Sequence, residues 1–194
     1  MAKLNLFPLG IVAYPTKKIP LHIFEERYKT LIAECIKNQN EFGIIYEDAN
    51  GLANIGCTVS VKELINQYHD GRMDILCVGK KIFKMKGKTR VNQITVGDIN
   101  YLPEPFLLPK SSFDPLKDKY LKIIITLGGA KDLKRHMFKK TTFELLEMIQ
   151  FPPKIEQELI SLSSEEKRAQ ILNKFFQSVL EETSNFNNNA KFLS

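Results

Sequence analysis

The sequence has no tryptophan, only three cysteines and no long hydrophobic run. No stretch of about 18 apolar residues occurs, and no charged segment followed by an apolar one opens the chain, so neither a membrane span nor a secretory signal is indicated. We therefore expect a cytoplasmic protein. Cys35, Cys57 and Cys77 are far apart and each lies within an apolar pattern, which predicts buried, reduced thiols rather than a disulfide.

Recognisable catalytic and metal-binding motifs are also missing. His22, His69 and His136 lie in separate segments, and no Cys-x-x-Cys, His-x-x-x-His or Gly-x-Ser-x-Gly spacing occurs. Gly87-Lys88-Thr89 matches the end of a phosphate-binding loop, but Ile82 occupies the position of its first glycine, and the surrounding pattern is strand, turn, strand. We expect a hairpin there, and we expect no enzymatic activity, no metal and no cofactor.

The composition is that of a globular protein. A chain of 194 residues with 43% hydrophobic residues can form one large domain or two small ones. The net charge is +6, which is compatible with an acidic partner. The basic residues concentrate in two clusters, Lys80, Lys81, Lys84, Lys86, Lys88 and Arg90, and Lys131, Lys134, Arg135, His136, Lys139 and Lys140.

The first half of the sequence predicts strands around one helix. Leu4–Leu9 and Phe42–Tyr46 are short apolar or alternating runs typical of strands, and Pro20 suits the end of an extended run. A helical stripe with one buried face follows, with apolar residues at Phe24, Tyr28, Leu31, Ile32, Cys35 and Ile36. We expect this helix to plug or cap a sheet, with Phe24 as an anchor.

Two hairpins are predicted after residue 54. Asp70-Gly71 between two β-rich runs favours a type I′ turn. A second pair of strands, residues 81–86 and 93–99, is expected to join around Gly87, with Phe83 and Lys84 on opposite faces. Gly79 is expected where the strand bends or is closely approached. A closed or nearly closed small β-barrel is the simplest architecture for these strands.

The second half predicts helices. After a proline-rich stretch, Asp114-Pro115 has the pattern of a helix start and Gly128-Gly129 that of a helix end. Thr141 with Glu144, and Ser163 with Glu166, are capping-box patterns. The last helix has a continuous apolar stripe, Ala169, Leu172, Phe175, Phe176, Val179 and Leu180.

These patterns divide the chain into four parts. We expect a β-barrel over residues 1–104, a proline-rich linker over 105–113, a helical bundle over 114–184 and a flexible, asparagine-rich tail over 185–194. The predicted class is α+β, with the barrel and its single inserted helix preceding the helices.

One block of residues resembles a known family. Leu6-Phe7-Pro8-Leu9, Pro20–Tyr28 and Asp70-Gly71-Arg72, followed by Val78-Gly79, resemble in content and order the N-terminal substrate-binding domain of the ATP-dependent Lon protease. The resemblance covers residues 4–104 well and residues 114–182 more loosely. It implies a PUA-like pseudo-barrel joined to a helical bundle, and a non-enzymatic module that binds unfolded or marked polypeptides, or a protease or ATPase partner.

Two sets of binding residues follow. The family motif points to Glu25, Arg27, Tyr28, Asp70 and Arg72, of which Glu25, Arg27 and Arg72 are expected to form a charged cluster across the helix and the hairpin. The alternative is a nucleic-acid-binding module that uses the basic run Lys80–Arg90, since lysines along a strand can follow a phosphate backbone. The alternation of Phe83 with lysines also fits a core residue beside a solvated edge.

Overall fold

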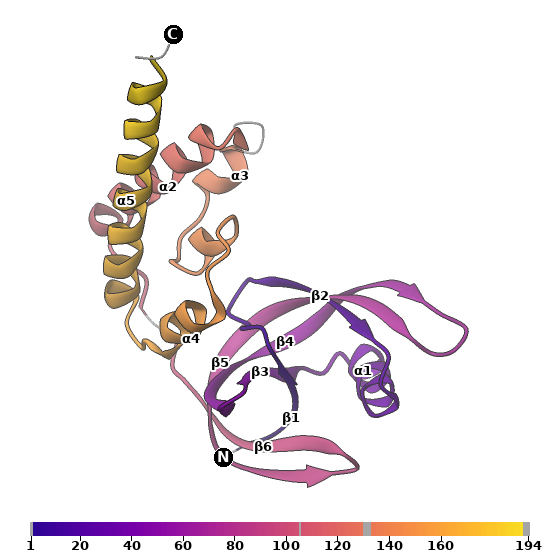
Figure 1. Ribbon diagram of the computed structural model, residues 1–194. Helices are drawn as coiled ribbons and strands as arrows, with labels where there is room; N and C mark the ends of the chain where they lie inside the picture. Colours follow the sequence, from indigo (N-terminus) through magenta and orange to yellow (C-terminus); the bar gives the residue numbers. More distant parts are fainter. Residues whose placement is uncertain (1, 105, 130–132, 192–194) are drawn as a thin grey trace. The chain divides into compact units, whose positions relative to one another are not determined.

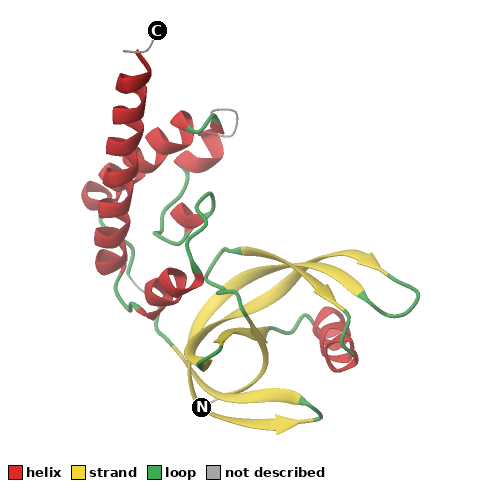
Figure 2. Ribbon diagram, viewed as in Figure 1, coloured by secondary structure: helices red, strands yellow, loops and turns green. Residues whose placement is uncertain are grey.

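The computed structural model describes residues 2–104, 106–129 and 133–191, with side chains as far as residue 183. The chain forms two units (Figure 1). One, the barrel unit, contains residues 1–104 and 151–163, and the other, the helical unit, contains residues 105–150 and 164–194. The sequence assigned 151–163 to the helical part, but the structure groups this segment with the strands. The mixed α+β class is confirmed (Figure 2).

Six strands build the barrel unit. They are β1 (Ala2–Leu9), β2 (Lys18–Ile23), β3 (Phe42–Asp48), β4 (Gly51–Gln67), β5 (Met73–Val91) and β6 (Ile94–Tyr101). Their order is β2-β5-β4-β3-β1-β6, and β5 also pairs with β6, so the hydrogen-bonded sheet closes on itself. The pairing of β1 with β3 is parallel, while the others are antiparallel. This closed ring is the arrangement predicted from the turn signals.

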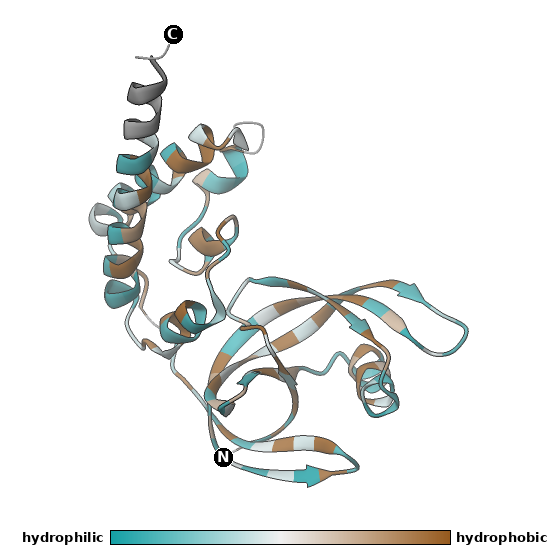
Figure 3. Ribbon diagram, in the orientation of Figure 1, coloured by the Kyte–Doolittle hydropathy of each residue, from teal (hydrophilic) through white to brown (hydrophobic). Residues whose placement is uncertain are grey.

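The interior of the barrel is small and apolar. Five buried side chains fill it: Leu4, Leu6, Ile45, Phe83 and Ile99. Gly56 makes room for the largest of them, because a Cβ at this position would lie 2.6 Å from the Phe83 ring. Phe83 points inward and Lys84 is exposed, as the alternation predicted, and the same alternation of hydropathy is visible along the strands in Figure 3.

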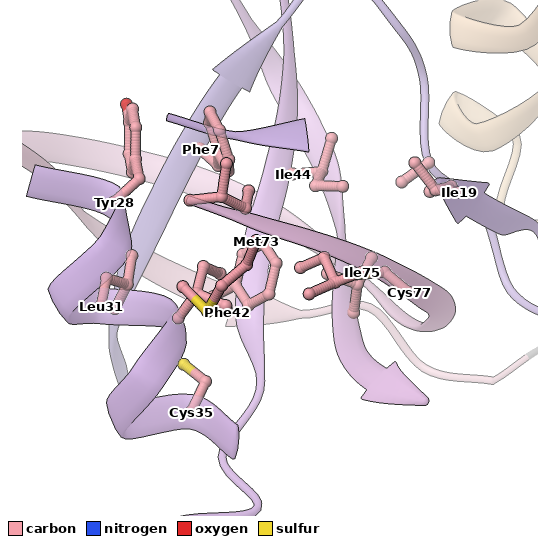
Figure 4. Close-up of a cluster of buried hydrophobic side chains, with 14 of the residues drawn as sticks. Phe7, Ile19, Tyr28, Leu31, Cys35, Phe42, Ile44, Met73, Ile75 and Cys77 are labelled. Carbon is pink, nitrogen blue, oxygen red and sulfur yellow. The ribbon is translucent and has the colours of Figure 1, made fainter. Parts of the chain in front are cut away.

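A second core lies where helix α1 (Glu26–Asn38) packs against the strands (Figure 4). Tyr28 stacks on Phe7 with ring centroids 3.9 Å apart, and Leu31, Ile32 and Cys35 are buried beside them. The predicted apolar stripe is therefore the packed face of α1. Its first member is not: Phe24 lies before the helix and is 61% exposed, so the expectation that it anchors the helix was wrong.

The turns differ from their predictions. The β4–β5 hairpin exists, but residues 68–72 form its loop and only Gly71 among them has positive φ, +82°, so the connection is longer than a two-residue type I′ turn. The β5–β6 hairpin turns at Asn92 and Gln93, which have φ of 47° and 64°. Gly87, the expected turn, is paired within β5.

Gly79 is closely approached, as predicted. A Cβ there would lie 1.9 Å from the Tyr14 carbonyl oxygen. The backbone of this glycine also accepts a hydrogen bond from Thr16 N and donates one to Lys17 O, each at 3.0 Å. The segment after β1 is therefore held against β5 by backbone contacts that leave no space for a side chain.

Helix α4 (Pro153–Ser161) belongs to the barrel unit through a buried charge pair. Lys17 Nζ donates to both carboxylate oxygens of Glu156 at 2.8 Å and to the Val12 carbonyl oxygen at 2.8 Å. Gln157 Nε2 adds a hydrogen bond to Ile55 O at 2.9 Å. These contacts explain why this short segment groups with the strands although it lies between parts of the helical unit in sequence.

Helix α2 (Lys110–Thr126) opens the helical unit, which also contains α3 (Leu133–Met137), the 3₁₀ turn η2 (Glu144–Leu146) and α5 (Glu165–Lys191). α2 begins before the predicted Asp114 cap, and Pro115 lies inside it. At this sixth position of the helix the proline removes one backbone hydrogen bond donor close to the start of α2. Gly128, with φ of +81°, follows the end of α2 as predicted.

Of the two predicted capping boxes, one forms and one does not. Glu144 accepts from Thr141 N at 2.9 Å while Thr141 Oγ1 accepts from Glu144 N at 3.3 Å, although the element that follows is only a 3₁₀ turn. For α5 the capping oxygen is that of Ser164, which accepts from Lys167 N at 3.3 Å, so the predicted capping box of Ser163 with Glu166 was wrong.

The chain beyond residue 184 differs from the prediction. α5 continues to Lys191, so the backbone of the asparagine-rich stretch is helical, while the flexibility expected of residues 185–194 stays a prediction. The apolar stripe of α5 is present where its side chains are described, with Leu172 and Phe176 buried. Residues 192–194 of the predicted tail lie outside the described residues.

The three cysteines are free and buried, as predicted. Burial raises the pKa of Cys35 to about 11 and the pKa of Cys57 and Cys77 to about 12. Among the described residues, no helix is both long and apolar enough to cross a bilayer.

Candidate functional site

The start of α1 is hydrogen-bonded to two hairpins, one of which carries the Asp70-Gly71-Arg72 part of the family motif. Lys29 Nζ donates to Asp70 O, in the β4–β5 loop, at 2.8 Å, and Arg27 Nη1 donates to Gln93 O, in the β5–β6 turn, at 3.0 Å. The first turns of α1 therefore bind the tips of both long hairpins (Figure 1). The residues joined by these bonds are 41 and 66 positions apart in the sequence.

The predicted charged cluster is absent, because its members form two local pairs. Arg27 Nη2 lies 2.6 Å from Glu25 Oε2, and Arg72 Nε lies 2.7 Å from Asp70 Oδ2. Asp70 also accepts from the backbone N–H of Arg72 at 3.1 Å, and this bond contributes most to the lowered pKa of its carboxyl. Each arginine pairs with the acid two residues before it, so the expected contact of Arg72 with the helix was wrong. Their role in binding remains a prediction.

Tyr28 lies in the core. It is 3% exposed, stacks on Phe7 and has the guanidinium of Arg27 over its ring at 4.5 Å. Burial is the main cause of its raised pKa. These contacts give Tyr28 a packing role, while its use as a binding residue stays a prediction.

Four residues, of which His22 and Phe24 belong to the Pro20–Tyr28 block, form a cluster that sequence reasoning missed. His22 Nδ1 lies 2.6 Å from Asp74 Oδ1, and Tyr68 donates from its hydroxyl to Asp74 Oδ2 at 2.7 Å. Phe24 stacks on His22 with centroids 6.0 Å apart. The hydrogen bond from His22 is the largest cause of the lowered pKa of Asp74. The cluster forms because the pairing register of β2 and β5 places His22 opposite Asp74. This register cannot be deduced from the spacing of residues in the sequence.

The alternative basic run is an exposed edge of β5. All six of its basic side chains, Lys80, Lys81, Lys84, Lys86, Lys88 and Arg90, are exposed. Phe83 is fully buried and unavailable for stacking, whereas Tyr101 is 48% exposed and Lys81 Nζ lies 6.0 Å from its ring centroid. Gly87-Lys88-Thr89 lies within the β5–β6 ladder, so it forms no phosphate-binding loop. The second basic cluster is partly internal, since His136 and Lys139 are buried, and its Lys131 lies outside the described residues.

Two hollows flank the C-terminal half of α1. The first, which we call the β1 hollow, has a volume of about 540 Å³ and is lined by Lys3, Leu4, Asn5, Leu31, Glu34, Cys35, Asn40, Glu41, Lys81, Val96 and Tyr101. The second, the β4 hollow, has about 390 Å³ and is lined by Cys35, Ile36, Gln39, Asn40, Ser60, Val61, Lys62, Glu63 and Leu64. Both volumes lie in the range of about 300–1,000 Å³ that is typical of ligand sites.

The described residues offer little for covalent or metal chemistry. Within the ranges that the structure describes, no group of three or more His, Cys, Asp or Glu side chains is arranged to hold a metal ion. The raised pKa values of the three cysteines mean that their thiols are protonated at neutral pH, and a protonated thiol is a poor nucleophile. What this surface presents is open hollows, hydrogen-bonding groups and charges of both signs.

Comparison with known proteins agrees with this architecture. The Lon N-terminal domain protein from Xanthomonas campestris is 21% identical, with 89% of this chain and 97% of that chain covered and a TM-score of 0.68. The N-terminal domain of the Mycobacterium avium complex Lon protease is 9% identical, with 91% and 98% covered and a TM-score of 0.75. At these identities the likeness shows a common fold.

A family model gives the assignment. Residues 3–193 match the substrate-binding domain of ATP-dependent protease La, also called Lon. The match includes both the barrel unit and the helical unit, and therefore nearly all of the sequence. The chain belongs to the family of Lon substrate-binding domains.

Proposed function

We propose that this chain is a non-enzymatic module that binds polypeptides through its barrel unit. The observation that carries the proposal is the pair of open hollows beside the C-terminal half of α1, on a unit whose described residues include no group arranged to hold a metal ion. Concave surfaces that combine apolar side chains with a few polar groups are common binding sites in proteins. The proposal includes a PUA-like barrel, a helical bundle, a cytoplasmic location and delivery of the bound chain to a protease or ATPase partner.

Binding to an unfolded chain tests the proposal directly. Reduced and carboxymethylated α-lactalbumin, labelled with a fluorophore, would be titrated with the pure protein and followed by anisotropy, with folded α-lactalbumin as the matched control. We expect saturable binding to the unfolded form only. Equal binding to both forms, or to neither, contradicts the proposal.

Hydrolysis must be tested separately. The pure protein would be incubated with ATP and with the carboxymethylated chain, and phosphate release and new amino groups would be measured. We expect neither product above the buffer control. Turnover that co-purifies with the protein and disappears on substitution of one of its own side chains would contradict the non-enzymatic part.

A second candidate is nucleic-acid binding by the basic run on β5. The supporting observation is that its six cationic side chains are all exposed and that none makes an ion pair with a described residue. Such a surface would bind phosphates with an affinity that falls as salt rises. Titration of labelled single-stranded RNA at two salt concentrations tests this, and binding that is lost in Lys84→Ala and Lys86→Ala would favour this candidate over the first.

A further inference from the structure

The β1 hollow has a feature that ordinary surface hollows lack, namely an unpaired strand edge. β1 pairs with β6 along Ala2–Leu6, but its pairing with β3 begins only at Leu6. On the β3 side, residues 2–5 therefore have no strand partner among the described residues. Three of them, Lys3, Leu4 and Asn5, line the hollow. Backbone N–H and C=O groups at such an edge can pair with an extended chain.

Most of the charged side chains around the hollow also make no ion pair with a described residue. Glu34 on α1 and Glu41 before β3 both line it, and neither makes an ion pair or a side-chain hydrogen bond with a described residue. Two cations also line the hollow. The Lys81 ammonium group lies 6.0 Å from the Tyr101 ring centroid and makes no ion pair with a described residue, and Lys3 reaches Asp98 at 3.5 Å while remaining 72% exposed. Acids and bases thus face one space without neutralising one another.

We propose that the β1 hollow binds an extended polypeptide segment that adds as a strand to the free edge of β1 and carries both a basic and an acidic side chain. The backbone of the segment pairs with residues 3–5, its basic side chain lies toward Glu34 and Glu41, and its acidic side chain lies toward Lys81. This inference rests on the proposed function and assigns it to one hollow.

Charge complementarity distinguishes this occupant from others. A nucleic acid would be repelled by Glu34 and Glu41, and a purely apolar segment would leave these carboxylates and the Lys81 ammonium group without partners. Interactions of this kind set specificity, because a segment with the wrong charge order places like charges together. The β4 hollow is less suitable, since β4 is bulged at Lys62 and Ile65, and bulges on an edge strand hinder the addition of another strand.

The test uses a fluorescein-labelled peptide with a repeated Asp-Leu-Lys sequence and a second peptide that is N-methylated at each leucine amide. Anisotropy titrations would compare the full chain with the double variant Glu34→Lys/Glu41→Lys, with Lys81→Glu, and with the control Asp118→Lys/Glu158→Lys. The control changes the net charge as much as the first variant does, at two exposed positions outside the hollow. Circular dichroism melting checks that all variants are folded.

We expect the dissociation constant to rise by about tenfold or more in Glu34→Lys/Glu41→Lys, to rise in Lys81→Glu, and to stay unchanged in the control. The N-methylated peptide should bind at least about tenfold more weakly than the unmethylated one, because methylation removes donors that the edge would accept. The inference is overturned if the protein binds both peptides with equal affinity. It is also overturned if Glu34→Lys/Glu41→Lys binds the unmethylated peptide as tightly as the wild type does.

The failure of this inference can be told apart from failure of the proposed function. If Glu34→Lys/Glu41→Lys binds the carboxymethylated chain as tightly as the wild type does, the hollow is not the site, but polypeptide binding stands. If the wild type binds neither the carboxymethylated chain nor the Asp-Leu-Lys peptide, both are wrong.

Discussion

Among the residues that the structure describes, the helical unit buries more polar and charged side chains than the barrel unit does. The barrel unit has two apolar clusters and a continuous hydrogen-bonded ring of strands. The helical unit buries a polar network, in which Arg168 and Glu165, 1% and 2% exposed, pair at 2.9 Å and both bond to the hydroxyl of Thr142. Arg168 also lies over the Phe143 ring at 4.4 Å. Strand ladders satisfy backbone groups internally, whereas the irregular segment before η2 needs side chains to do so.

A second buried group in the helical unit follows the same principle. Tyr120 and His136, both fully buried, are joined at 2.7 Å between the hydroxyl oxygen and Nδ1. Lys139 donates to Glu144 O at 2.7 Å and lies 2.5 Å from Glu147 Oε2. The first bond joins α2 to α3, and the bonds of Lys139 join the segment after α3 to η2 and to the residue that follows it. The comparison therefore predicts that the barrel unit responds most to loss of apolar volume and the helical unit to loss of a charge.

Phe83→Ala should have the largest effect in the barrel unit. It removes the largest side chain from the barrel interior, and truncations of this kind cost about 3–5 kcal/mol. Amide hydrogen exchange, which reports each unit separately, should show the loss in β4, β5 and β6. Phe24→Ala is the matched control, because Phe24 is 61% exposed and its removal should change stability by only about 0.5 kcal/mol. Comparable losses in the two variants would contradict the assignment of the core.

Arg168→Met should destabilise the helical unit to a similar degree. Removal of one partner of a buried ion pair leaves Glu165 without compensation, at a cost of about 3–5 kcal/mol. Arg135→Met is the control, since Arg135 pairs with Glu147 at 3.1 Å with 52% of its side chain exposed, and such a pair contributes about 0–1 kcal/mol. Hydrogen exchange in α5 and η2 should separate the two variants. If Arg168→Met leaves these amides protected, the buried network does not stabilise the unit.

The sequence predicted the helices and strands better than it predicted the turns between them and the side-chain contacts. The strands, the packed face of α1 and the stripe of α5 were correct because apolar periodicity reflects burial directly. The turn at Asn92–Gln93 was missed because neither residue is glycine, although both have positive φ. The buried Arg168 was missed because a charged residue beside an apolar stripe reads as solvated. The His22–Asp74 contact and both hollows depend on strand register, which no single segment encodes.

Two glycines on β5 test whether backbone contact stabilises the barrel unit. In Gly79→Ala the new Cβ would meet the Tyr14 carbonyl oxygen at 1.9 Å, so the backbone must move, and overpacking of this kind costs roughly 1–3 kcal/mol. In Gly87→Ala the nearest atom would be Asp98 Oδ2 at 3.5 Å, an ordinary contact, and stability should be unchanged or higher by about 0.5 kcal/mol. Urea midpoints would compare them. Equal destabilisation would mean that the approach of residues 14–17 to β5 is not tight.

The smallest expected effect concerns the one carboxylate that the barrel unit buries among its described residues, Glu156. Burial raises its pKa above the ordinary value of 4.5, and the Lys17 ammonium group only partly offsets this. The folded protein therefore binds a proton at a higher pH than the unfolded chain does. As the pH falls from above the folded pKa, the contribution of Glu156 to stability increases. It is constant below a pH of about 4.5, the ordinary pKa of the carboxyl. Glu156→Gln removes that dependence. The difference in urea midpoint between wild type and Glu156→Gln, measured across this window, should shift in favour of the wild type as pH falls. If the difference in urea midpoint does not change with pH, or changes in the opposite direction, the bond to Lys17 outweighs burial. Helix α4 would then be attached by a favourable ion pair, and in this respect the barrel unit would resemble the helical unit.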